Sequence, residues 1–351
     1  MPKQIQIVGA GLSGLTAAVI LAREGHTVTV LDAQKGIGGS PSLHPSVHGT
    51  PVQIKELMAY TGIDFTPSFR KTPQYPRFYN KTKLITMPPY TQYNDAYCIE
   101  RGPRPSSIDN YLYKLAKDAG VKFEFGQRVD IKKAAPGTIV ATGLSRKEYE
   151  DLGIAAERLW GWWSYKEIPE RTDDVLSIMG PFTSDYGYIG ITNGLDYNLL
   201  FSHRPVTQKD KDGYRKVLSK LGIGGYLEPW RDESMCIPSE AKLIAGDLIL
   251  AGTLGGMIEP FWGYGIVGAI VSGRVAAKAV TNRAEALADY EGFTRGFATK
   301  SARHRKLVAY PHLVRSVLIR GGIAWMRLQC ALDKKLATTP RDPVKWFRGK
   351  R

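Results

Sequence analysis

Cysteine is scarce in this chain, and long hydrophobic runs are absent. Cys98, Cys236 and Cys330 lack the spacing of metal ligands and cannot all pair with one another, so we expect reduced thiols rather than a disulfide framework or a zinc site. No run of about 18 apolar residues is free of charge, which predicts that the chain does not span a bilayer. The first apolar run begins at once and belongs to a folded motif; we therefore expect no signal peptide and a cytoplasmic protein.

Acidic residues are too few to balance the basic ones. Lys and Arg number 48 against 33 Asp and Glu, a net charge of +15. Residues 300–351 hold 14 of these basic residues and only two acidic ones. An excess of this sign predicts an anionic partner. Because no nucleic-acid recognition fold is evident, we expect a membrane surface and not nucleic acid.

The basic end of the chain also carries a helical pattern over residues 312–332. Trp325, Trp346 and Phe347 lie among cations, as in segments that rest at headgroup depth. The alternative is a helix packed on the body of the protein, followed by a solvated basic tail. Its predicted apolar positions are Leu313, Val317, Ile319, Ala324, Met326 and Leu328, and its predicted polar side holds Arg315, Arg320 and Arg327.

A strand, a glycine-rich turn and a helix open the chain. Residues 5–8 are predicted to form a buried strand, residues 9–14 a Gly-Ala-Gly-Leu-Ser-Gly turn, and residues 15–23 a helix. A second strand over residues 27–31 ends in Asp32. This order, with a carboxylate at the end of the second strand, predicts a βαβ unit that binds a dinucleotide.

Each glycine of this turn has a physical task. Gly9 permits the tight turn, Gly11 lets the backbone approach a pyrophosphate, and Gly14 lets helix and strand pack closely. The helix N-terminus offers unpaired N–H groups to the phosphates. Asp32 can accept hydrogen bonds from both ribose hydroxyls.

A second glycine-rich stretch lies late in the chain. Residues 248–251 form a predicted strand, residues 252–266 a glycine-rich loop, and the following residues a helix. Between the two stretches, a predicted strand over residues 138–143 ends in Ala-Thr-Gly. Gly263, Gly265 and Gly268 also fit a glycine triad, but no strand directly precedes it, so we expect no separate NAD domain.

Together these stretches resemble the signatures of FAD-dependent flavoproteins, and the late one resembles that of geranylgeranyl reductases and aromatic hydroxylases. The resemblance implies bound FAD. Thr253 stands where the family motif has an acid, so its hydroxyl or another group must replace the usual carboxylate there. Arg101 matches an arginine near the FAD in these families. The sequence is equally consistent with an arginine in a surface turn that does not contact the cofactor. The implied cofactor residues are Gly9, Gly11, Leu12, Ser13, Gly14, Asp32, Ala33, Gly38, Gly39, Arg101, Val129, Ala141, Thr142, Gly143, Gly252, Thr253, Gly263, Gly265 and Ile266.

The middle of the chain is rich in aromatic residues and strand-like runs. Asn193 and Gly194 predict a hairpin turn between two of these runs. We expect an antiparallel sheet with an apolar cleft, in which Tyr186, Tyr188 and Trp162 contact substrate, although aromatic residues with period two are also typical of a core.

The predicted fold class is therefore α/β. A Rossmann-like FAD domain is followed by an antiparallel-sheet substrate domain and a helical basic tail. The FAD domain is assigned to residues 1–65, 98–155 and 240–285. The substrate domain is assigned to residues 66–97 and 156–239, and the tail to residues 286–351.

No catalytic constellation stands out, as expected where flavin carries the redox step. The candidates that could face the flavin are Tyr264, Trp262, Glu259, His44 and His48. The two histidines are four residues apart, but Pro45 intervenes and no acidic partner is near. We therefore predict no metal site.

By resemblance, the expected activity is reduction of carbon–carbon double bonds in a polyprenyl lipid at a membrane surface. The electrons would come from a donor protein or NAD(P)H. A flavin monooxygenase or desaturase acting on a hydrophobic substrate is the alternative enzyme. A non-catalytic subunit, stabilised by FAD and recruiting partners through its tail, is the third hypothesis.

Overall fold

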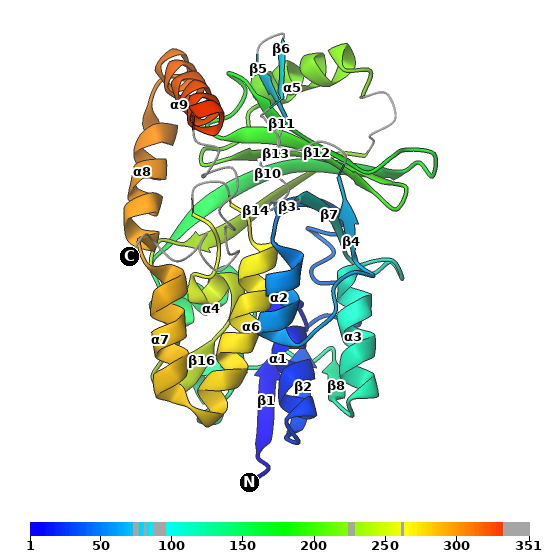
Figure 1. Cartoon of the computed structure of the whole chain (residues 1–351), viewed down its shortest axis with the longest axis vertical. Coiled ribbons are helices and arrows are strands. Elements are labelled where there is room, and N and C mark those ends of the chain that lie inside the picture. The colour runs from blue at the N-terminus through cyan, green and yellow to red at the C-terminus, as the bar shows by residue number, and fades with distance from the viewer. Residues whose placement is uncertain (73–76, 81–82, 87–95, 224–228, 261–262, 333–351) are drawn as a thin grey trace.

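The computed structural model describes the chain except residues 73–76, 81–82, 87–95, 224–228, 261–262 and 333–351. Its described strands form three sheets (Figure 1). The first has six strands in the order β15 (Ile244–Ala245), β16 (Leu248–Leu250), β9 (Ile139–Val140), β1 (Gln4–Val8), β2 (Thr27–Asp32) and β8 (Lys122–Phe125). All neighbours pair in parallel except β15 and β16. This is the predicted Rossmann-like core.

Helices α1 (Leu12–Arg23), α3 (Ile108–Asp118) and α6 (Ile266–Thr281) pack with this sheet. The side chain of Ser107 caps α3 by accepting a 3.2 Å hydrogen bond from the Asn110 N–H. Helices α1 and α6 lie so close that a Cβ at Gly273 would stand 2.6 Å from the Ser13 carbonyl oxygen. The first and last thirds of the chain therefore share one core.

The second sheet has seven strands in the order β14 (Arg231–Pro238), β10 (Ala156–Glu167), β13 (Leu195–Ser202), β12 (Tyr186–Thr192), β11 (Asp174–Met179), β5 (Arg77–Asn80) and β6 (Lys83–Thr86). It is antiparallel, as predicted, except where β11 and β5 pair in parallel. Asn193 and Gly194, at φ 50° and 68°, make the predicted hairpin turn. Helix α5 (Gln208–Lys220) covers one face through Tyr214 and Leu218.

A small sheet joins the two large ones. Its order is β3 (Ser46–Pro51), β7 (Ala96–Arg101) and β4 (Phe69–Lys71), and α2 (Ile54–Thr61) follows β3. Val47 and Cys98 pack in one buried cluster with Trp163 and Tyr197 of the seven-stranded sheet. Cys98 and Cys236 are both free thiols. The remaining short elements are η1 (Ile131–Lys133), α4 (Arg146–Asp151) and η2 (Gly252–Gly255).

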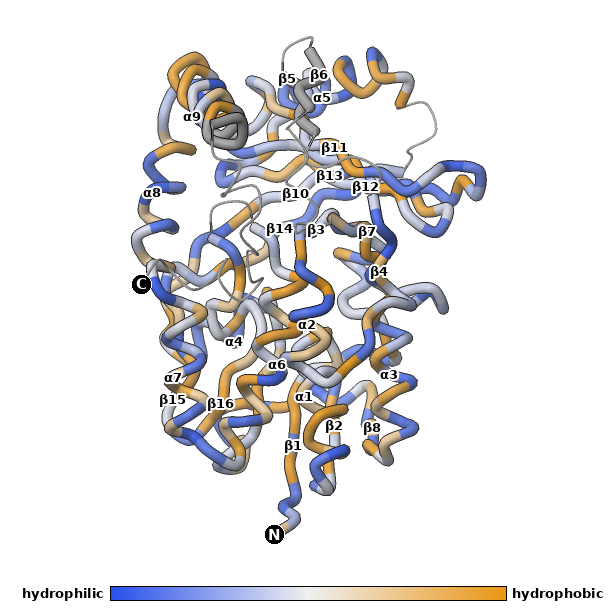
Figure 2. Tube along the Cα trace, in the orientation of Figure 1, coloured by the Kyte–Doolittle hydropathy of each residue, from blue (hydrophilic) through white to orange (hydrophobic). Residues whose placement is uncertain are grey.

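Three helices, α7 (Arg283–Thr294), α8 (Phe297–Ala309) and α9 (His312–Leu332), run along one side of the molecule (Figure 1). The bounds of α9 match the predicted helix, and the structure shows which of its residues face the protein. Arg315 is buried, and its Nη2 donates a 2.6 Å hydrogen bond to the Thr183 carbonyl oxygen. Figure 2 shows hydrophobic stretches along α9. The exposed residues of α9 include large apolar ones: Leu313, Val314, Val317, Leu318, Trp325 and Leu328.

Arg315, Ser316 and Ile323 of α9 therefore face the protein, whereas Arg320 and several large apolar side chains are exposed. The side chains of Met326 and Arg327, together with Cys330, Trp346 and Phe347, lie outside the described side chains. Among the described helices, none combines the length and the apolar character that crossing a membrane would require.

Candidate cofactor and substrate site

The turn between β1 and α1 has the geometry that its glycines predict. Gly9 lies at φ 108°, and a Cβ there would approach the Ala141 carbonyl oxygen to 2.4 Å. A Cβ at Gly14 would meet the Gly9 carbonyl oxygen at 1.9 Å. Both positions therefore require glycine for close packing of backbone on backbone.

Gly11 is different, because a Cβ there would meet no atom within 4 Å. It lines a cavity of about 560 Å³ and is the N-cap residue of α1, where no side chain caps the helix. The first N–H groups of α1 are thus free of side-chain caps beside an open space. This arrangement favours an anionic group such as a pyrophosphate.

Asp32 closes the other side of this turn. Its carboxylate accepts hydrogen bonds from the main-chain N–H of Ala10 at 2.6 Å and from that of Gln34 at 2.7 Å. These bonds fix the carboxylate at the cavity wall, and ionised oxygens retain lone pairs for further donors. Its position suits the predicted contact with ribose hydroxyls.

The late glycine-rich stretch reaches the same cavity. The Gly252 N–H donates a 2.5 Å hydrogen bond to the Ser272 hydroxyl of α6, which ties η2 to that helix. Thr253 lines both this cavity and a second one beside it. The Glu259 N–H donates a 3.0 Å hydrogen bond to the Tyr264 carbonyl oxygen, and the Gly263 N–H donates one of 2.9 Å to the Glu259 carbonyl oxygen.

Most of the predicted cofactor residues line the two cavities. The exceptions are Gly14 and Gly38, which serve packing: a Cβ at Gly38 would lie 2.5 Å from the Pro103 nitrogen. The residues on the larger cavity are Gly9, Gly11, Leu12, Ser13, Asp32, Ala33, Gly39, Arg101, Val129, Ala141, Thr142, Gly143, Gly252 and Thr253. Gly263, Gly265 and Ile266 line the second cavity. Sequence reasoning missed Gln127, Arg128 and Arg158, which no motif marks.

The larger cavity fits a flavin dinucleotide. Its size lies within the usual range for cofactor and ligand pockets, about 300–1,000 Å³. The buried hydroxyl of Thr142 on its wall has no hydrogen-bond partner among the described residues, so a ligand atom would satisfy it. Gly11 leaves open the space that a pyrophosphate would fill.

Arg101 does not lie in a surface turn, which was the alternative interpretation of its sequence. Its side chain is 15% exposed, and its Nε and Nη2 lie 2.8 and 2.9 Å from the two carboxylate oxygens of Asp109. It lines both cavities. The ion pair therefore positions a guanidinium where the cavities meet.

The second cavity, of about 240 Å³, is mainly apolar. Tyr186 and Tyr188 line it as predicted, beside Leu159, Leu199 and Phe201. Burial, followed by the charge of neighbouring Tyr264, raises the pKa of Tyr186 well above its usual value. Burial likewise raises the pKa of Tyr188, whose hydroxyl donates to the Val47 carbonyl oxygen. Both phenols are therefore protonated at neutral pH.

Trp162 does not lie with these tyrosines. Its ring stacks on Trp230 with centroids 4.0 Å apart, inside the buried cluster under α5. The side chains on β10 alternate between the two faces of the sheet, and that of Trp162 points to the face that α5 covers. This placement argues against its predicted contact with substrate.

His44 and His48 both lie on the apolar cavity, bridged by one hydroxyl. Ser46 Oγ is 2.8 Å from His44 Nδ1 and 3.0 Å from His48 Nε2. Burial, followed by the positive charge of Arg101, lowers the pKa of His44 well below its usual value. The same two causes lower the pKa of His48 to about 3. Both rings are thus neutral at physiological pH.

Glu259 and Tyr264 also line the apolar cavity, and Glu259 is buried. Trp262 lies outside the described residues. The cavity wall includes Glu157, His203 and His304, which sequence reasoning missed. They come from separate parts of the chain, so no local spacing marks them.

The comparisons with known proteins agree with this geometry. The NAD(P)-binding Rossmann-like domain family matches residues 7–55. The L-amino-acid oxidase of Bothrops pauloensis is 63% identical over 38 residues, and that of Daboia russelii is 56% identical over 46 residues. These matches span 11% and 13% of this chain, and only 8% and 9% of the oxidases. Each match therefore covers only a short part of this chain and of the oxidase.

Solved structures match almost the whole chain at low identity. A geranylgeranyl bacteriochlorophyll reductase-like protein from Thermoplasma acidophilum has a TM-score of 0.71 at 16% identity, over 97% of this chain and 96% of that protein. The p-nitrophenol 4-monooxygenase of Pseudomonas putida has a TM-score of 0.62 at 14% identity, over 97% and 100%. A flavin-dependent halogenase has a TM-score of 0.56 at 15% identity, over 87% and 66%.

The chain therefore has the fold of the FAD-dependent oxidoreductases. It is structurally similar to a geranylgeranyl reductase-like protein and to a monooxygenase. The predicted fold, resemblance and cofactor are confirmed at this level.

Proposed function

We propose that the chain is an FAD-dependent oxidoreductase that reduces carbon–carbon double bonds in a polyprenyl, geranylgeranyl-type lipid or another hydrophobic substrate. The observation that carries the proposal is the junction of the two cavities. Leu43, His44, Arg101 and Thr253 line both of them. A dinucleotide that lies along the larger cavity would bring its reactive end to the mouth of the apolar one.

The residues of the chain have separate tasks in this reaction. FAD, when bound, supplies the two-electron chemistry. The apolar wall around Leu199 and Phe201 binds an aliphatic substrate and excludes water from it. The neutral rings of His44 and His48 add no charge that would oppose an apolar substrate.

Tyr186 holds a proton at the right place for this reaction. A Cβ at Gly263 would lie 3.9 Å from the Tyr186 hydroxyl, so the phenol stands beside the predicted flavin loop. Reduction of a double bond adds a hydride to one carbon and a proton to the next. A phenol of raised pKa is protonated at neutral pH, so it can donate that proton to the carbon. The Tyr188 hydroxyl donates to the Val47 carbonyl oxygen.

The outward face of α9 supports membrane association. Leu313 is 72% exposed and Val317 68%, while Arg303, Lys306 and Arg320 are exposed cations on α8 and α9. An apolar face flanked by cations suits an anionic bilayer surface. We propose that α9 rests on this surface and that Phe297 and Ser301 of α8, which line the apolar cavity, separate the cavity from the lipid side. Electrons would come from a donor protein or NAD(P)H.

A flavin-dependent monooxygenase acting on a hydrophobic substrate is the second candidate. The observation in its favour is the match to the p-nitrophenol 4-monooxygenase structure, which spans nearly the whole chain. The two reactions differ in what they add to the substrate. A reductase adds two hydrogens per double bond, whereas a monooxygenase adds an oxygen atom and consumes O₂.

The decisive experiment purifies the chain with detergent, records the flavin absorption spectrum and identifies co-purifying lipid by mass spectrometry. The flavin is then reduced without oxygen and mixed with a geranylgeranyl lipid. We expect flavin reoxidation and a product heavier by two hydrogens. Oxygen uptake with NADPH oxidation and an oxygenated product would favour the monooxygenase, and a chain that holds no flavin would refute both proposals.

A further inference from the structure

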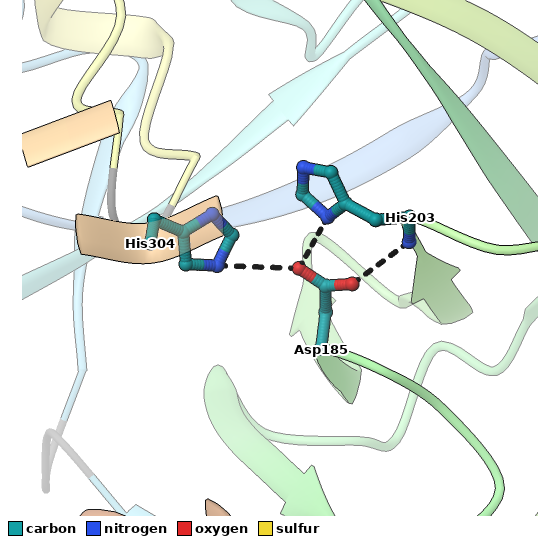
Figure 3. A group of neighbouring side chains, drawn as sticks. All are labelled: Asp185, His203 and His304. Atoms are coloured by element: carbon teal, nitrogen blue, oxygen red, sulfur yellow. Dashed lines mark hydrogen bonds and ion pairs between the residues drawn. The ribbon is translucent and has the colours of Figure 1, made fainter. Parts of the chain in front are cut away.

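Three side chains from distant parts of the chain, Asp185, His203 and His304, converge on one another (Figure 3). His203 and His304 line the apolar cavity. Asp185 directly precedes β12, His203 directly follows β13, and His304 lies in α8. Asp185 Oδ1 is 2.7 Å from His203 Nδ1 and 3.3 Å from His304 Nε2. One potential ligand atom of each residue lies within 4.8 Å of the others. Two imidazoles and a carboxylate thus converge on one point.

A surrounding set of contacts orients each of these groups. The second oxygen of Asp185 accepts hydrogen bonds from the Ser184 hydroxyl at 2.6 Å and from the His203 main-chain N–H at 2.9 Å. His203 Nε2 faces Glu157 Oε2 at 3.8 Å, and Arg305 Nη1 holds Glu157 at 2.5 Å. Metal-bound histidines and carboxylates usually have such outer partners, which fix their orientation.

The surroundings of His203 can accommodate a metal ion at Nδ1, because its other ring nitrogen, Nε2, lies 3.8 Å from a carboxylate oxygen of Glu157. With a metal ion at Nδ1, the proton resides on Nε2 and points at Glu157. The carboxylate–histidine–metal arrangement then satisfies both nitrogens.

The carboxylate of Asp185 is shielded from water, because its side chain is only 1% exposed. Buried charged groups are usually paired with other groups or coordinate a metal ion.

We propose that Asp185, His203 and His304 bind a divalent transition-metal ion of the zinc or ferrous class. Two imidazoles and one carboxylate suit these ions, and three protein ligands leave at least one coordination position open. Because His203 and His304 also line the apolar cavity, an oxygen-bearing group in that cavity can take the open position. The sequence predicted no metal site, since its only histidine pair of suggestive spacing was His44 and His48. The proposal does not depend on the reaction proposed above.

The test uses the purified full chain with its flavin, freed of metal by a chelator and dialysed against Co²⁺ or Zn²⁺. We expect a single ion per chain by elemental analysis, and visible ligand-field bands for Co²⁺. His304→Ala and His203→Ala remove a ligand and should abolish stoichiometric binding. Glu157→Gln keeps all three ligands and should weaken binding by about 10–100-fold. His26→Ala, at a histidine bound to the Lys3 main-chain N–H, is the matched control.

Flavin absorbance and circular dichroism establish that each variant is folded. A folded wild-type chain that binds neither ion stoichiometrically would overturn the proposal, and so would a His304→Ala chain that binds as the wild type does. In those cases the cluster is only a hydrogen-bonded contact between α8 and the sheet. If His304→Ala does not fold, the Glu157→Gln affinity decides, because an unchanged affinity there contradicts the predicted outer contact.

Discussion

Arg101 and Asp109 form a bidentate ion pair. The carboxylate is fully buried, and the guanidinium lines both cavities. Arg101→Ala leaves that carboxylate without its cation. We expect the flavin-free chain to lose about 3–5 kcal/mol of unfolding free energy, because a buried charge then lacks a partner. Urea unfolding measures this loss. Arg146→Ala, which breaks an exposed pair with Glu150, is the control and should change nothing measurable. Equal stability of the two variants would contradict the prediction.

Substitutions at two glycines of the first turn should separate cofactor binding from folding. Gly11→Val places its side chain in open space, so the chain should fold normally and bind FAD at least about tenfold more weakly, because the side chain occupies the phosphate position. Gly14→Val drives its side chain into the Gly9 carbonyl and should prevent folding. Thermal unfolding and flavin titration report the two effects. A Gly11→Val chain that retains full FAD affinity would show that the phosphates lie elsewhere.

Removing the hydroxyl of Tyr186 should show whether this residue is the proton donor. If the chain reduces double bonds, Tyr186→Phe should slow reduction of the substrate by about 10²–10⁴-fold, the usual contribution of a positioned acid, and leave flavin content unchanged. Tyr188→Phe is the matched control, because its hydroxyl is engaged with Val47. Single-turnover reoxidation of reduced flavin gives both rates. Equal rates in the two variants would assign the proton to another group.

Charges on the outer face of α9 should abolish membrane binding. Burying Leu313 and Val317 in a bilayer gains about 1.5–3 kcal/mol each, so Leu313→Glu with Val317→Glu should reduce flotation with anionic vesicles at least tenfold. Binding of the wild type should weaken with salt. Lys55→Glu, at an exposed residue of α2, lowers the net charge by the same two units and is the control. If the two variants float alike, net charge and not α9 governs binding.

Features set by neighbouring residues could be predicted from the sequence, and those set by distant ones could not. The glycine turn, Asp32 and the Asn193–Gly194 hairpin follow from local backbone requirements, and the structure contains all three. The helical period also located α9. It could not tell which face is buried, because that depends on the Thr183 carbonyl that Arg315 meets.

The same limit applies to the faces of the seven-stranded sheet and to the proposed metal site. Strand alternation places Trp162 and its neighbours on opposite faces, but only α5 decides which face is the core. Asp185, His203 and His304 meet because α8 packs beside the ends of β12 and β13. The spacing of these three residues in the sequence does not predict that packing.

The interleaved order of the six-stranded sheet has a consequence during synthesis. β1 pairs early with β2, but β9 gains its second neighbour only when β16 has been made, and α1 gains its packing partner only with α6, so one edge of β9 and one side of α1 stay uncovered until α6 has left the ribosome. At about 5–20 residues per second, this takes roughly 15–60 s. During that time the apolar strands of the nascent chain are open to chaperones and to aggregation. The residues expected to hold FAD are all present only after the ribosome has passed Ile266, so we expect flavin to bind late in translation.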